Sequence, residues 1–103
     1  MTDASHAIAS AKLIAATAID ERTDDLIRLA KDIWNHPEPG FREHRTAKKT
    51  AEFMQATGLE PREGVAITGV VAQLDTGRPG PHIALMGELD SLIVPDQRAA
   101  DPN

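Results

Sequence analysis

Two carboxylates, Glu88 and Asp90, stand at the end of an unbroken apolar run, residues 83–86. Glycine and proline bound the run, which therefore suits a strand buried on both faces. Because Glu88 and Asp90 are two residues apart, they lie on the same side of an extended chain. Ligands of open α/β sheets bind beyond the carboxyl ends of the strands, so these carboxylates are placed for chemistry. The alternative is that they cap a turn or start a helix.

The elements before this run begin with a long helical segment. Residues 5–35 predict one helix, because no Gly or Pro interrupts them and apolar side chains recur at helical spacing. The polar residues 20–25 leave open a split, with Thr23 as the N-cap of a second helix. His36 precedes Pro37, and proline disfavours a helical conformation in the residue before it, so the helix ends there.

A second helix is predicted over residues 43–57, with Gly58 as its C-terminal stop. The signals then change to β, and we predict strands at residues 59–63, 68–75 and 81–89. The turn-forming composition of residues 75–80 predicts that the last two strands form a hairpin. The expected fold class is α/β, with two helices followed by about three strands. Aromatic residues make up only 3% of the 103 residues, so we expect a thin core.

Composition excludes several functions. The formal net charge is −5, and the basic residues Arg45, Lys48 and Lys49 fit a solvated helix face, so we expect no nucleic-acid partner. No stretch approaches the roughly 20 apolar residues that cross a bilayer, and we expect no membrane partner. The absence of cysteine excludes disulfides and fits a cytoplasmic protein.

Three segments together resemble one family: residues 34–43 (WNHPEPGFRE), 68–72 (TGVVA) and 87–92 (GELDSL). Their order is similar to the start of the metal-dependent amidohydrolases and peptidases, which include aminoacylases, glutamate carboxypeptidases, auxin-conjugate hydrolases and aminobenzoyl-glutamate hydrolases. The resemblance implies that residues 1–103 are the N-terminal fragment of a single catalytic α/β domain. It also implies that the complete enzyme cleaves amide bonds of N-acyl amino acids or small peptides.

The same resemblance implies roles for the two carboxylates. Asp90 matches the family's catalytic aspartate, which accepts a hydrogen bond from a histidine that binds the metal, zinc or manganese. Glu88 stands where several branches carry a metal-binding histidine, so we assign it no ligand role. We expect it either to contact a metal-binding residue without touching the metal or to face the substrate. A glutamate at this position is most similar to the aminobenzoyl-glutamate hydrolase branch.

The resemblance also implies what the 103 residues lack. In that branch a His-Ala-Cys-Gly-His segment follows the aspartate and supplies metal ligands, and a general-base glutamate comes later. Neither occurs before Asn103, so we expect this chain alone to hold no metal and to be inactive. The histidines lack the spacing of a metal site: His6, His36, His44 and His82.

Two further expectations concern partners. A last strand at residues 81–89 would have no neighbour to cover it, so the chain is expected to self-associate or to form a homo-oligomer. The alternative to an enzyme fragment is a non-catalytic helix-and-hairpin module that binds a partner through its first helix.

Overall fold

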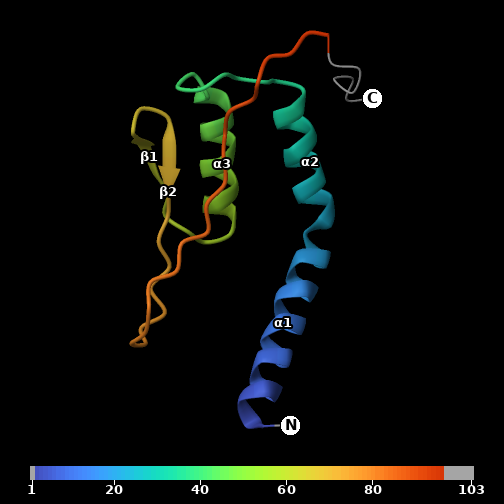
Figure 1. Ribbon diagram of the computed structural model, residues 1–103, viewed down its shortest axis with the longest axis vertical. Coiled ribbons are helices and arrows are strands. Elements are labelled where there is room, and N and C mark those ends of the chain that lie inside the picture. The colour runs from blue at the N-terminus through green and yellow to red at the C-terminus, as the bar shows by residue number, and fades with distance from the viewer. Residues whose placement is uncertain (1, 97–103) are drawn as a thin grey trace. The chain divides into compact units, whose positions relative to one another are not determined.

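The computed structural model describes residues 2–96 and has an α/β fold with three helices and a two-stranded antiparallel sheet (Figure 1). The elements in chain order are α1 (Asp3–Glu21), α2 (Thr23–Trp34), α3 (His44–Ala56), β1 (Arg62–Val65) and β2 (Gly69–Val71). The chain forms two compact units, one ending at Asp32 and one beginning at Ile33.

The single helix predicted over residues 5–35 is wrong, because the structure has α1 and α2 in its place. Arg22 separates them with φ −106° and ψ 10°, and its N–H donates to the carbonyl oxygen of Ile19. The break at Arg22 lies within the polar residues 20–25, where the sequence left open a split into two helices. Thr23 begins α2 and is not its N-cap, since its hydroxyl donates to the Ile19 carbonyl oxygen at 3.4 Å and the Arg22 carbonyl accepts from Leu26.

The helix α3 lies within one residue of each predicted bound. Gly58 has φ +89° and forms a Schellman turn after the helix. The Gly58 N–H donates to the carbonyl oxygen of Gln55, and the Leu59 N–H donates to the carbonyl oxygen of Met54. The buried side chains of α3 are Thr46, Ala47 and Ala51. Because alanine contributes little apolar area, the core of this unit is thin, as the composition predicted.

The hairpin β1–β2 packs on α3 and pairs Arg62 with Val71 and Glu63 with Val70. A bulge interrupts the register at Gly64, whose φ is +74°. The connecting turn contains Ala66 and Ile67 with φ of +48° and +81°. A type I′ hairpin turn requires positive φ at two successive positions, and these positions are normally occupied by Asn and Gly.

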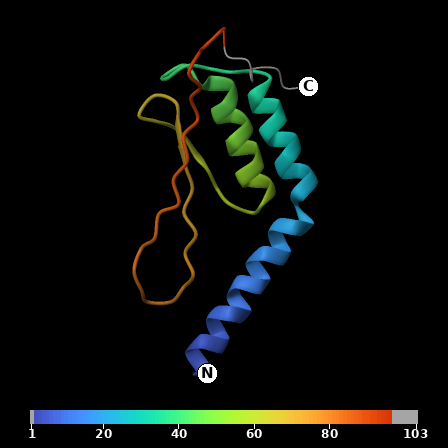
Figure 2. The ribbon, with the colours of Figure 1, turned by 45° about the vertical axis from the view of Figure 1, so that its right-hand side comes forward.

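The third predicted strand, residues 81–89, and its hairpin with residues 68–75 are absent from the described part of the chain. The chain turns through residues 75–80 and runs back in extended form beside the hairpin without pairing with it (Figures 1 and 2). The partner of β2 is β1, and Pro79 and Pro81 have no N–H to donate to a ladder. The apolar run is consequently exposed, with Leu85 at 99% and Met86 at 94%.

Candidate functional site

The two candidate carboxylates, Glu88 and Asp90, are both exposed. Between and after them, Leu89 and Ser91 are half-buried. This alternation indicates that the segment is locally extended, with Glu88 and Asp90 on its solvent side and Leu89 and Ser91 on its inner side. The two carboxylates therefore lie on the same side of the chain although the segment belongs to no sheet.

One backbone hydrogen bond joins this segment to the loop before α3. The Ser91 N–H donates to the carbonyl oxygen of Glu38 at 2.8 Å. The extended chain can be followed to this loop in Figures 1 and 2. The bond places Asp90 one residue from a fixed contact with residues 34–43, so two of the three segments that carry the family resemblance meet here.

The side chain of Glu38 caps α3 from outside the helix. Its Oε2 accepts the N–H of Arg45 at 3.0 Å, and its Oε1 accepts the N–H and the hydroxyl of Thr46 at 2.6 and 2.7 Å. The first N–H groups of a helix have no partner within it and carry partial positive charge, so a carboxylate satisfies and stabilises them. Glu38 thus fixes the loop to the start of α3.

Glu43 immediately precedes α3 but makes no side-chain capping bond. It is 7% exposed, and its Oε2 accepts the hydroxyl of Thr68 at 2.6 Å. Thr68 lies in the hairpin turn and is also 7% exposed. The carboxylate of Glu43 therefore ties the hairpin to the start of α3, and Glu38 supplies the helix cap in its place.

Hydrogen bonding holds the pKa of both carboxyls below the ordinary glutamate value. Burial of Glu38 raises its pKa. The hydrogen bonds from Thr46 and Arg45 and the nearby charge of His44 together lower the pKa by more than burial raises it. The pKa of Glu43 is lowered mainly by the Thr68 hydroxyl, against smaller opposing effects of burial and of the Glu38 charge. Both groups are therefore held in the ionised form that accepts these bonds.

Sequence reasoning did not single out Glu38, Glu43, Thr46 or Thr68 as a network. Glu38 and Glu43 lie in the first segment of the family resemblance, and Thr68 begins the second. An acidic residue in the Pro-rich turn before a helix, with threonine in the first turn of that helix, is the signal that would have found the cap.

The described residues do not form a metal site. Within residues 2–96 no three side chains of His, Cys, Asp or Glu are grouped so that they could hold a metal ion. Asp90 and Glu88 are exposed, and an exposed pair of carboxylates alone does not supply the three protein ligands of a catalytic zinc site. The residues present thus do not by themselves fit the zinc or manganese that the family resemblance implies.

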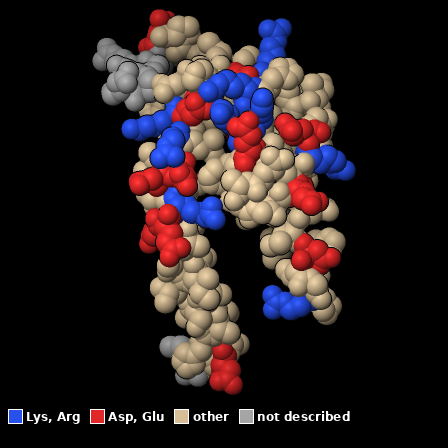
Figure 3. All heavy atoms as spheres, turned by 180° about the vertical axis from the view of Figure 1, so that it is seen from behind, with Lys and Arg blue, Asp and Glu red and all other residues tan. Residues whose placement is uncertain are grey.

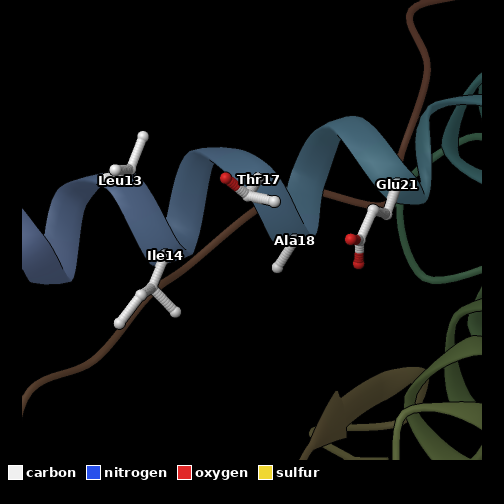
Figure 4. A pocket seen from close by; sticks show the side chains of 5 residues that line it. All are labelled: Leu13, Ile14, Thr17, Ala18 and Glu21. Carbon is white, nitrogen blue, oxygen red and sulfur yellow. The ribbon is translucent and has the colours of Figure 1, made fainter.

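A shallow hollow of about 380 Å³ lies along α1, away from these carboxylates in sequence. Its lining comes from one helix: Leu13, Ile14, Thr17, Ala18 and Glu21. Figure 4 shows Leu13 pointing to one side of the helix and Ile14 and Ala18 to the other, so the side chains do not converge on a common point. The hollow has the polar groups of Thr17 and Glu21 alone and lacks the convergent polar groups typical of an active site.

The surface charge is mixed in sign. Figure 3 shows acidic and basic side chains interspersed on the face in view, with no area of that face occupied by one sign. Ion pairs join Arg28 to Asp25 at 3.0 Å and Lys49 to Glu52 at 3.4 Å. None of the helices within residues 2–96 combines the length and the apolar character that a membrane span needs.

Several curated proteins are similar in sequence to this chain. Thermostable carboxypeptidase 2 of Saccharolobus solfataricus is 34% identical over 77 residues, which are 74% of this chain and 20% of that protein. IAA-amino acid hydrolase ILR1-like 2 of Arabidopsis thaliana is 32% identical over 83 residues, 81% of this chain and 19% of the relative. N-acetylcysteine deacetylase of Bacillus subtilis is 32% identical over 73 residues, 70% of this chain and 19% of the relative.

The matched segment is only part of each relative, since the chain spans about a fifth of the length of these curated proteins. No family model and no solved structure matches the chain. The relatives nevertheless agree in kind, because their names describe hydrolases of peptides, amino-acid conjugates and N-acyl amino acids. Over the segment that it shares with them, the chain matches part of the amidohydrolases and peptidases that its sequence resembles.

Proposed function

We propose that the complete protein containing this chain hydrolyses the amide bond of N-acyl amino acids or small peptides. The observation that carries this proposal is the agreement among the relatives. Their names specify N-acetylcysteine, N-acyl-L-amino acids and IAA-amino acids, each of which joins an acyl group to the nitrogen of an amino acid. Residues 1–103 would supply part of a single catalytic α/β domain of this enzyme. We place the enzyme in the cytoplasm, a location with which the absence of cysteine is compatible.

Asp90 is the residue of this chain that we assign to the reaction. Its carboxylate would accept a hydrogen bond from a histidine of the complete enzyme and hold that imidazole in one orientation. The histidine would bind zinc or manganese, which supplies Lewis-acid chemistry when present. Glu88, on the same side of the segment, would either contact a metal-binding residue without touching the metal or face the substrate. The exposure of both carboxylates and the anchoring of Ser91 support this assignment.

The test is hydrolysis of N-acetyl amino acids by the complete protein and by its Asp90→Asn variant. Asn keeps the shape of the side chain but loses the charge that orients a histidine, so kcat/KM and metal content should fall by roughly 10- to 100-fold. Melting temperature should change little, because an exposed residue contributes little packing. Glu88→Gln is the matched control and should cost less.

Two results would contradict the role of Asp90 and the expected inactivity of residues 1–103 alone. The first is an Asp90→Asn variant that hydrolyses substrate normally or that loses activity only because it unfolds. The second is metal-dependent turnover by the purified 103-residue chain, since one positioning aspartate cannot both hold a metal and activate water.

The second candidate function is a non-catalytic module that binds a partner through α1. The observation that favours it is that none of the residues of α1 is buried, although the helix carries Ile8, Leu13, Ile14 and Ile19. A complete protein that binds its partner through α1 but hydrolyses no N-acyl amino acid or peptide would establish this function in place of the enzyme.

A further inference from the structure

The segment that carries Glu88 and Asp90 is held at a single described point. Among residues 81–96, the structure shows one backbone-to-backbone hydrogen bond, from Ser91 to the Glu38 carbonyl oxygen. The side chains of residues 81–88 are exposed, with Ile83 at 83% and Leu85 at 99%, and Leu89 is half-buried. The position of Asp90 therefore depends on where Glu38 is held.

Glu38 is itself held by its other end. Its main-chain carbonyl faces Ser91, while its carboxylate accepts three bonds from Arg45 and Thr46 at the start of α3. Thr46 is 1% exposed and lies among the buried residues of α3. One residue thus connects the core of this unit, through its side chain, to the carboxylate segment, through its backbone.

We propose that Glu38 is the positioning residue for Asp90: its carboxylate docks the loop on α3, and its carbonyl holds Ser91 and so sets the place of the neighbouring aspartate. Release of the carboxylate from α3 frees the loop to move and weakens the Ser91 bond. A cap that served only the helix would leave Ser91 unaffected. The consequence for catalysis rests on the proposed role of Asp90, but the structural link does not.

Glu43 provides a matched comparison within the same helix start. Its carboxylate is also hydrogen-bonded and its pKa is also lowered, but it contacts Thr68 of the hairpin turn. Removing the Glu43 carboxylate should therefore loosen the hairpin. Removing the Glu38 carboxylate should loosen residues 88–91.

The experiment is amide hydrogen exchange, read by NMR, on the 103-residue chain and its Glu38→Ala and Glu43→Ala variants. In Glu38→Ala the Ser91 amide should exchange about tenfold faster relative to the Ala51 amide in the middle of α3. In Glu43→Ala the Ser91 amide should keep its protection relative to Ala51. Unchanged Ser91 exchange in a folded Glu38→Ala chain would overturn the proposal.

Glu38→Gln covers the case in which Glu38→Ala unfolds. Glutamine keeps one acceptor oxygen but turns the other into a donor, so Arg45 or Thr46 loses its acceptor while the side chain keeps its size. Ser91 should again exchange faster, by a smaller factor, and equal protection in Glu38→Gln and the parent chain would refute the link.

Activity gives an independent reading. In the complete protein Glu38→Gln should lower kcat with little change in KM, because it displaces Asp90 without removing a substrate contact. If no N-acyl amino acid or peptide is hydrolysed, the proposed function fails, whereas faster exchange at Ser91 would still establish the positioning role of Glu38.

Discussion

Gly69 is a residue at which the hairpin leaves no room for a side chain. A Cβ added there would collide with the backbone carbonyl oxygen of Val65, its cross-strand partner. Because backbone cannot turn away as a side chain would, Gly69→Ala requires the strands to separate. We expect the unfolding free energy to fall by roughly 1–3 kcal/mol, measured by chemical denaturation. At Gly80 an added Cβ meets nothing within 4 Å, so Gly80→Ala is the control, and equal losses in both variants would contradict the explanation.

At the scale of single residues, sequence spacing predicted features that depend only on neighbouring residues of the chain. The spacing of Glu88 and Asp90 predicted that they share a side, and the alternating exposure of residues 88–91 agrees. The role of Glu38 was not predictable in the same way. Its carboxylate reaches α3 across a turn in which Phe41 has φ +61°, a conformation that neither periodicity nor composition specifies.

At the scale of elements, the turn of the hairpin stores strain that a substitution can remove. Ile67 has φ +81°, which is costly for a β-branched residue, and its side chain is 67% exposed. Ile67→Gly should therefore raise the unfolding free energy by about 1 kcal/mol, measured by thermal and chemical denaturation. Val70→Gly, at a strand position that pairs with Glu63, should instead lower it. A loss of stability in Ile67→Gly would show that the Ile67 side chain contributes more than its conformation costs.

The helices were predicted better than the strands for a physical reason. A helix satisfies its hydrogen bonds within its own sequence, so α3 follows from its residues and from Gly58. A strand needs a partner, and which segment pairs with β2 is decided by the rest of the chain. Residues 83–86 carry a strand-like sequence, but within residues 2–96 they pair with no strand, because β2 pairs with β1.

At the scale of the whole molecule, the two lowered carboxyl pKa values predict a dependence of stability on acid. A carboxyl whose pKa is lower in the folded chain stabilises the fold fully above the ordinary glutamate pKa of about 4.3, and this contribution is lost as pH falls through the folded-state value. Melting temperature should therefore fall as the pH is lowered below about 4.5, because Glu38 and Glu43 become protonated. The Glu38→Gln, Glu43→Gln double variant should show a flatter profile, and an identical profile would exclude these groups as the cause.

The exposed apolar run predicts association between chains. Leu85 and Met86 are almost fully exposed, and the segment around them is extended with unpaired backbone groups. Such segments pair with one another. Sedimentation velocity should show self-association of the 103-residue chain that increases with concentration, whereas the Leu85→Lys, Met86→Glu variant should remain monomeric. A monodisperse parent chain would contradict this expectation.

The hydrogen bonds at the start of α3 also differ in the length of chain that each one closes into a loop. Glu43 and Thr68 are 25 residues apart in sequence, and Ser91 lies still further along the chain from Glu38. Helices close local contacts first, while each distant contact must wait for a larger loop to close at a greater entropic cost. The Glu38–Ser91 bond should accordingly form after α3 and the hairpin. The segment that carries Asp90 would then be the last part of this unit to acquire its place and the first to leave it.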